Sequence, residues 1–229
     1  MPFARRDRTI TTFRVYPHGV RMRDGIGGLL LAAGEGRRFG RPKALVEFEG
    51  ERLVDRGVRM LRDAGCGPVI VVTGAASIEV IGAVVVPNPD WRTGMGSSLR
   101  AGLAALPPGC PAVVVALVDQ PLVTPAAVRR LTEAYESGAP VAVATYGGRP
   151  RNPVLIARAH FAEAAARAVG DAGARAFLRE HPELVTPVPC DDVASPDDID
   201  TPDDLVALSA HRLAGRQDGS PAGSMRDDR

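Results

Sequence analysis

The sequence is poor in the residues that build disulfide, thiolate and imidazole sites. It has three cysteines in 229 residues, an odd number, and none of them forms a CxxC pair. This argues against a disulfide framework and a Cys-rich zinc site, and it favours a reducing, cytoplasmic location. The four histidines form no HxxxH pair, which argues against a histidine-based metal site.

A strong net charge and a long apolar run are also missing. The 28 basic and 27 acidic side chains leave a formal net charge of +1, whereas nucleic-acid and membrane-surface binders usually have a clear basic excess. The longest apolar run, Ala112–Val118, has seven residues, while a membrane-spanning helix needs about 20. We therefore expect neither a nucleic-acid nor a membrane partner.

The chain alternates short apolar runs with helical patterns, and its hydrophobic content of 45% is that of a globular protein. Strands are predicted at Ile26–Ala32, Val69–Thr73, Ala83–Val86, Ala112–Val118, Val141–Tyr146, Pro153–Ala157 and Val185–Val188. Helices are predicted at Leu53–Ala64, Ser97–Leu106, Pro125–Ser137, Phe161–Val169, Ala172–Glu180 and Pro202–Ala210. The alternation predicts an α/β fold of three layers, α/β/α, around a mostly parallel open sheet.

The two ends of the chain differ from the part between them. Residues 1–24 contain six arginines and little periodicity, and we expect a flexible N-terminal extension. Met22 lies just before the first predicted strand, so whether residues 1–21 belong to the native protein stays open. Residues 25–210 form the predicted domain, and residues 211–229, rich in Gly, Ser, Arg and Asp, a predicted disordered tail.

The most informative segment is a glycine-rich loop that directly follows the first predicted strand. Gly34, Gly36 and Gly40 permit backbone N–H groups to close around an anion, and Arg37 and Lys43 bring positive charge. The loop lacks the Gly-Lys-Ser/Thr of a P-loop. Its GxGxxxG spacing also differs from the GxGxxG of a dinucleotide fingerprint. The segment therefore predicts a phosphate-binding loop of another kind.

Two further segments place polar groups at the ends of predicted elements. Gly94, Ser97 and Ser98 precede or begin a helix, where backbone and hydroxyl donors suit a polar or anionic ligand. Asp119 follows a buried strand, at the sheet edge where open α/β sheets bind ligands. A carboxylate beside a bound phosphate needs a cation, and Mg²⁺ is the usual one.

The motif LAAGxGxRxGxPK in this loop resembles the signature of the MobA-like nucleotidyltransferases. Segments around Asn88, Asp119, Asp171 and Asp200 resemble that family in the same order. The resemblance implies a Rossmann-like fold of the nucleotide-diphospho-sugar transferase type. It implies catalytic roles for Lys43, Arg37 and Asp119, and nucleotide binding by Ala32, Ala33, Gly34, Gly36, Asn88, Gly94, Ser97 and Ser98. It also implies acceptor binding by Asn152, Asp171 and Arg175, and Mg²⁺ binding by Asp119 and Asp200.

The implied reaction is attack by an acceptor phosphate on the α-phosphorus of an NTP, with release of pyrophosphate. Ala32-Ala33-Gly34 is similar to the cytidylyl members, whereas guanylyl members tend to carry Ala-Gly-Gly, so CTP is expected over GTP. Molybdopterin is the leading acceptor and a molybdoenzyme an implied protein partner. Arg151-Asn152-Pro153 stands where the family usually has Gly-His-Pro, which leaves the acceptor open.

Three alternatives remain at this point. Within the nucleotidyltransferases, the acceptor could instead be a phosphosugar, a phospholactate or methylerythritol phosphate. A glycosyltransferase would share the nucleotide-binding architecture and the carboxylate metal motif, but it would not need the loop of Lys43. A non-catalytic nucleotide-binding protein for cofactor insertion would not need Asp119 and Asp200. The sequence does not indicate the oligomeric state.

Overall fold

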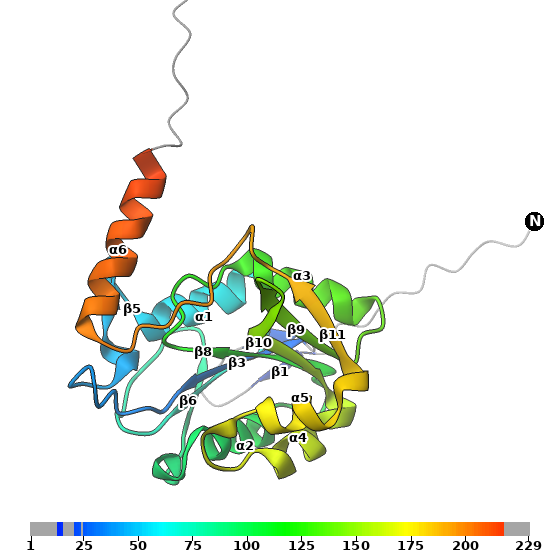
Figure 1. Cartoon of the computed structure of the whole chain (residues 1–229). Helices are drawn as coiled ribbons and strands as arrows, with labels where there is room; N and C mark the ends of the chain where they lie inside the picture. The colour runs from blue at the N-terminus through cyan, green and yellow to red at the C-terminus, as the bar shows by residue number, and fades with distance from the viewer. Residues whose placement is uncertain (1–12, 16–20, 24, 218–229) are drawn as a thin grey trace, which may run out of the picture.

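The computed structural model describes residues 13–15, 21–23 and 25–217, and it contains a seven-stranded sheet between two layers of helices (Figure 1). The strand order is β11-β9-β10-β8-β3-β6-β7. The strands are β3 (Gly27–Ala32), β6 (Val69–Thr73), β7 (Val84–Pro87), β8 (Ala112–Leu117), β9 (Val141–Tyr146), β10 (Arg149–Ala157) and β11 (Val185–Pro189). β10 is antiparallel to both of its neighbours, and the other pairs of this sheet are parallel. The predicted three-layer, mostly parallel α/β fold is confirmed.

The central strand β3 shows why the apolar runs are continuous rather than alternating. Its side chains face two separate cores: Leu29 and Leu31 belong to one, and Leu30 and Ala32 to the other. A parallel sheet covered on both faces requires apolar residues at every position. In register, Leu29 pairs with Ile70 of β6 on one side and with Val115 of β8 on the other.

The helices cover the two faces of the sheet in the predicted order (Figure 1). One core includes side chains of α1 (Leu53–Asp63) and α3 (Pro125–Glu136), and the first turns of α6 (Pro202–Gln217) pack against it. The other core includes side chains of α2 (Met95–Ala105), α4 (Phe161–Arg167) and α5 (Arg175–Glu180). Short 3-10 turns lie at η1 (Lys43–Leu45), η2 (Trp91–Thr93), η3 (Arg158–His160), η4 (Gly170–Ala172) and η5 (Pro182–Leu184).

The ends of the chain contain more regular structure than the sequence predicts. Two short strands, β1 (Phe13–Val15) and β2 (Arg21–Arg23), pair within the stretch expected to be flexible. The helix α6 continues beyond residue 210 to Gln217, into the expected tail. The other residues of these two predicted segments lie outside the described ones. The hairpin of β4 (Glu47–Phe48) and β5 (Glu51–Arg52) was not predicted, because two-residue strands are too short to show an alternating pattern.

Both helix starts that carry a Thr-Pro pair are formed in the structure. The hydroxyl of Thr124 accepts a hydrogen bond from the backbone N–H of Ala127 and donates one to the carbonyl of Val193. At α6, Thr201 and Asp204 exchange side-chain and backbone hydrogen bonds, which is the reciprocal pattern of a capping box. Among the described residues, no helix is long and apolar enough to cross a bilayer.

The cap at Thr124 leads to a prediction on stability. We expect Thr124→Ala to lower the free energy of unfolding by about 1–2 kcal/mol, because one helix donor and one loop carbonyl lose their partner. Thr132→Ala, in the middle of the same helix, is the matched control and should stay within about 0.5 kcal/mol of the wild type. Urea denaturation measures both variants, and equal stabilities would contradict the role of the cap.

Candidate active site

A pocket of about 480 Å³ lies at the carboxyl ends of β3 and β8, where connections leave the sheet in opposite directions. Ten of the residues predicted for the site line it: Ala33, Gly34, Gly36, Arg37, Lys43, Gly94, Ser98, Asp119, Asp171 and Asp200. Ala32, Asn88, Ser97, Asn152 and Arg175 are not among its lining residues. The fold thus brings most of the predicted residues to one place.

The glycine-rich loop leaves β3 and turns back sharply before Lys43. The carbonyl of Gly36 accepts hydrogen bonds from the backbone N–H groups of Phe39 and Gly40 at 2.9 and 2.8 Å. Gly36 has a φ of 65°, and a Cβ atom there would lie 2.1 Å from the carbonyl oxygen of Arg41. Only glycine permits this closure, which aims the backbone at the pocket and fixes where Lys43 begins η1.

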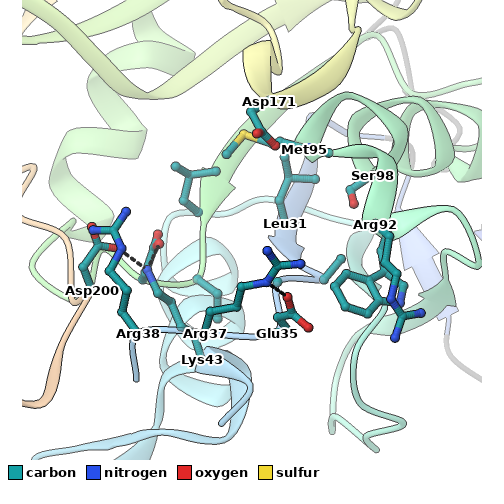
Figure 2. Close-up of a pocket in the computed structure, with 18 residues that line it drawn as sticks. Leu31, Glu35, Arg37, Arg38, Lys43, Arg92, Met95, Ser98, Asp171 and Asp200 are labelled. Atoms are coloured by element: carbon teal, nitrogen blue, oxygen red, sulfur yellow. Dashed lines mark hydrogen bonds and ion pairs between the residues drawn. The ribbon is translucent and has the colours of Figure 1, made fainter. Parts of the chain in front are cut away.

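Lys43 lies between two carboxylates that are far away in the sequence. Its Nζ donates to Asp119 Oδ2 at 2.8 Å and also to Asp200 Oδ1, and Arg38 Nη1 donates to Asp200 Oδ2 at 3.2 Å (Figure 2). The Lys43 side chain is only 15% exposed. The expected convergence of Asp119 and Asp200 is therefore present, with the ammonium group of Lys43 at the point where they meet.

The backbone around Asp200 explains how this carboxylate is brought to the end of β8. The N–H of Ile199 donates to the carbonyl of Asp119 at 2.8 Å, and the Ile199 side chain is fully buried. On the other side, Asp204 Oδ2 accepts from the backbone N–H groups of Asp200 and Thr201 at 3.0 and 2.8 Å. The cap of α6 and the end of β8 therefore position Asp200 together.

The charge state of Lys43 follows from its surroundings. Burial by itself lowers the pKa of this ammonium group, but the charge and hydrogen bond of Asp119, together with those of Asp200, outweigh burial and raise the pKa above its ordinary value. Lys43 is therefore positively charged throughout the neutral range. A fixed positive charge of this kind suits a group that neutralises phosphate oxygens.

Asn88 and Ser97 shape the loop before α2 rather than line the pocket. Asn88 is buried, and its Nδ2 donates to the hydroxyls of Ser97 and Ser98 at 2.8 and 3.1 Å. Its Oδ1 accepts from the N–H of Asp90 at 3.0 Å, and the Ser97 hydroxyl contacts the carbonyl of Gly94 at 2.9 Å. In this network only Ser98 and Gly94 reach the pocket wall.

A segment predicted to bind the nucleotide contacts a segment predicted to bind the acceptor, and the contact lies at Gly94. This glycine has a φ of 110°, and a Cβ atom there would lie 2.4 Å from the carbonyl oxygen of Gly170. The N–H of Met95 donates to Asp171 Oδ1 at 3.4 Å. Arg175, by contrast, is exposed at the start of α5, and Asn152 lies within β10.

Sequence reasoning assigned no site role to Trp91 or Arg92, and it counted Arg38 only among the cations of the loop, but all three residues also line the pocket. Arg38 pairs with Asp200, and the Cζ atom of Arg92 lies 4.4 Å from the centre of the Trp91 ring. All three residues stand inside the motifs that carried the family resemblance. Which of a motif's side chains face the pocket depends on the path of the loop, and a linear pattern does not show this path.

The donor set fits a divalent cation of the Mg²⁺ or Mn²⁺ type. Asp119 and Asp200 offer carboxylate oxygens to one point, and such ions are commonly held by one or two carboxylates, with water and substrate phosphates completing the coordination. In the part of the chain that the structure describes, no group of three or more His, Cys, Asp or Glu side chains converges. The site therefore suits a cation shared with a phosphate ligand.

Residues 28–185 match the family of MobA-like NTP transferase domains, and the chain belongs to this family. A molybdenum cofactor guanylyltransferase of Rhizobium meliloti (strain 1021) is 31% identical, over 80% of this chain and 89% of the relative. A nicotine blue oxidoreductase of Paenarthrobacter nicotinovorans is 36% identical, over 80% of this chain and 96% of the relative. The family and its transferase members make this chain an enzyme of the nucleotidyltransferase type.

The fold is shared with solved structures. The manganese complex of Rv0371C from Mycobacterium tuberculosis H37Rv is 29% identical to this chain, with a TM-score of 0.69 over 81% of this chain and 98% of that one. Nucleotidyltransferases of this kind commonly use a divalent metal, and Rv0371C, which shares the fold, has been solved in complex with manganese.

Gly34 allows a test of which face of the loop meets the ligand. A Cβ atom on Gly34 would meet no atom within 4 Å, and its backbone lies outside the left-handed region. We expect Gly34→Ala to fold normally but to bind nucleoside triphosphate about 10- to 100-fold more weakly, because the new methyl group enters the pocket.

Gly67→Ala is the matched control, because a Cβ atom there also meets no atom within 4 Å and Gly67 is not among the pocket-lining residues. Calorimetry measures the affinities, and thermal unfolding checks the fold. Equal nucleotide affinity of the Gly34 and Gly67 variants would show that this face of the loop does not contact the nucleotide.

Proposed function

We propose that residues 25–217 form a domain that transfers a nucleoside monophosphate from an NTP to a phosphorylated acceptor and releases pyrophosphate. CTP is the favoured nucleotide, and molybdopterin is the leading acceptor. The observation that carries the proposal is the meeting of Lys43, Asp119 and Asp200 in the same pocket as the glycine-rich loop. This arrangement combines backbone donors, a fixed cation and a carboxylate pair, which are the parts that a triphosphate requires.

The chemistry follows from the charges. An oxygen of the acceptor phosphate attacks the α-phosphorus in line, a new P–O bond forms, and the bond to the bridging oxygen of pyrophosphate breaks. Lys43 and Arg37 would neutralise the negative charge that grows on the leaving pyrophosphate. A divalent ion held by Asp119 and Asp200 would supply Lewis-acid stabilisation of the phosphate oxygens. Positioning and charge neutralisation suffice, so no covalent enzyme intermediate is needed.

The choice of CTP rests on the pocket-lining residues that would contact the base. Ala33 lines the pocket, where its methyl group leaves less room for a purine than the glycine of the guanylyl-type motif. Trp91 and the Arg92 guanidinium stacked on it also line the pocket, and an aromatic surface suits a flat base. A one-methyl difference of this kind is worth about 1–3 kcal/mol.

An anionic acceptor is supported by the strand next to β8. Arg149 and Arg151 are exposed at the start of β10. Because β10 is antiparallel to β8, its start lies at the same sheet edge as Asp119. Two arginines there favour a phosphorylated acceptor, and phosphosugars and methylerythritol phosphate remain alternatives to molybdopterin.

Because one relative is named an oxidoreductase, hydride transfer is the alternative reaction to compare with nucleotidyl transfer. That chemistry uses a nicotinamide or flavin cofactor. The glycine spacing of this loop, GxGxxxG with Pro42 following, is not that of the dinucleotide fingerprint. The charged cluster of Lys43 with two carboxylates favours phosphoryl chemistry instead.

The experiment mixes the protein with Mg²⁺, one of four NTPs and an acceptor panel, and measures pyrophosphate. We expect CTP to support turnover at least ~10-fold better than GTP, from the steric difference at Ala33. Trp91 is the only tryptophan of the chain, so its fluorescence reports nucleotide binding independently of turnover. Better turnover with GTP would overturn the choice of nucleotide. Absence of pyrophosphate with any NTP and acceptor would overturn the transferase proposal.

The two carboxylates give a further prediction. Asp119→Asn and Asp200→Asn each keep side-chain size and remove one charge, so each should abolish most Mg²⁺-dependent turnover. The double variant should lose far less than the product of the single losses, since both side chains act through one cation. Steady-state kcat/KM measures the losses, and thermal unfolding checks the fold. Multiplicative losses would mean that Asp119 and Asp200 have independent roles.

A further inference from the structure

The ammonium group of Lys43 occupies the position that a cation held by Asp119 and Asp200 would take. It contacts one oxygen of each carboxylate, and Arg38 contacts the second oxygen of Asp200 (Figure 2). Two positive side chains thus balance the two carboxylates. Because the Lys43 side chain is mostly buried, solvent screens these contacts only in part.

A divalent ion and this ammonium group compete for the same oxygens. Mg²⁺ takes carboxylate oxygens at about 2.1 Å and needs near-octahedral geometry around it. The ammonium donates to Asp119 at 2.8 Å and points at the same place from the loop side. Two cations in contact with the same oxygens would also repel each other. A divalent ion that binds the two oxygens contacted by Lys43 therefore has to displace the ammonium group from them.

A bound triphosphate would give Lys43 another partner in the pocket. Lys43 lines the same pocket as Gly34 and Gly36, whose loop would surround the phosphates. Phosphate oxygens can accept the hydrogen bonds that Lys43 gives to the two carboxylates. Moving the ammonium from carboxylate to phosphate keeps its charge compensated, whereas a divalent ion alone would leave it without a partner.

We propose that Lys43 excludes the free divalent ion from Asp119 and Asp200, so that the metal enters the pocket together with the triphosphate. The nucleotide half of this inference rests on the proposed function, and the metal half rests on the side-chain contacts alone. Because coupling between two ligands is reciprocal, the triphosphate tightens metal binding as much as the metal tightens triphosphate binding. Lys43 thereby acts as a positioning residue for the metal, in addition to its contact with phosphate.

The test measures Mn²⁺ affinity by electron paramagnetic resonance in the protein without nucleotide. We expect Lys43→Met to bind Mn²⁺ at least ~10-fold more tightly than the wild type, a change of about 1.4 kcal/mol. Arg41→Met is the matched control. It removes one positive charge from the same loop, but the Arg41 guanidinium stacks on Phe39 and is not among the pocket-lining groups. Its Mn²⁺ affinity should change less than ~2-fold.

Two further measurements keep the outcome clear. Lys43→Gln serves as a second variant in case Lys43→Met does not fold, and thermal unfolding checks the fold of both. Adding Asp119→Asn to Lys43→Met should remove the gained affinity, which locates the ion at these carboxylates. In the wild type, a non-hydrolysable CTP analogue should tighten Mn²⁺ binding at least ~10-fold.

Equal Mn²⁺ affinity of the wild type and both Lys43 variants would overturn the inference. The nucleotide-free measurement does not depend on nucleotidyl transfer. A gain of affinity in the Lys43 variants, combined with no pyrophosphate release by the wild type, would therefore reject the proposed function and leave the exclusion by Lys43 standing.

Discussion

The contact of the Lys43 ammonium group with Asp119 and Asp200 joins three parts of the chain that the sheet brings to one edge. Lys43 and Asp119 are mostly buried, and a buried charge is costly without a partner, so these groups stabilise one another only when the fold places them together. The glycine turn at Gly36, the end of β8 and the cap of α6 all determine where these side chains lie. The cluster therefore forms only when all three of these elements are in place.

The scaffold around the cluster is made of backbone contacts and close packing. Gly94 lies against Gly170 without room for a side chain, and Asn88 is buried in a network of hydroxyls. A site held by such contacts keeps its residues in place largely through backbone packing and buried side chains. This arrangement is consistent with a family whose relatives carry both transferase and oxidoreductase names, because pocket side chains can change while the scaffold stays.

Local patterns in the sequence were sufficient for the strands of the main sheet, for the six α-helices of the described residues and for their order along the chain. The run Val69–Thr73 and the run Val141–Tyr146 are strands with the predicted bounds, because a parallel strand buried on both faces leaves an uninterrupted apolar signature. The Thr-Pro pairs marked two helix starts for a similar local reason. The lengths of the terminal elements were not predictable in this way, since α6 runs on to Gln217 through residues that resemble a tail.

The sequence by itself determined the three-layer fold and the glycine-rich loop with its basic residues. Only the tertiary structure decided which of these residues meet. The partners of Lys43 stand 76 and 157 positions away, and the order of strands in the sheet brings them together. The packing of distant elements also explains three further features: the burial of Asn88, the contact of Gly94 with Gly170, and the position of Trp91 in the pocket wall. Periodicity reports the environment of one element, whereas a side chain's partner depends on how several elements pack.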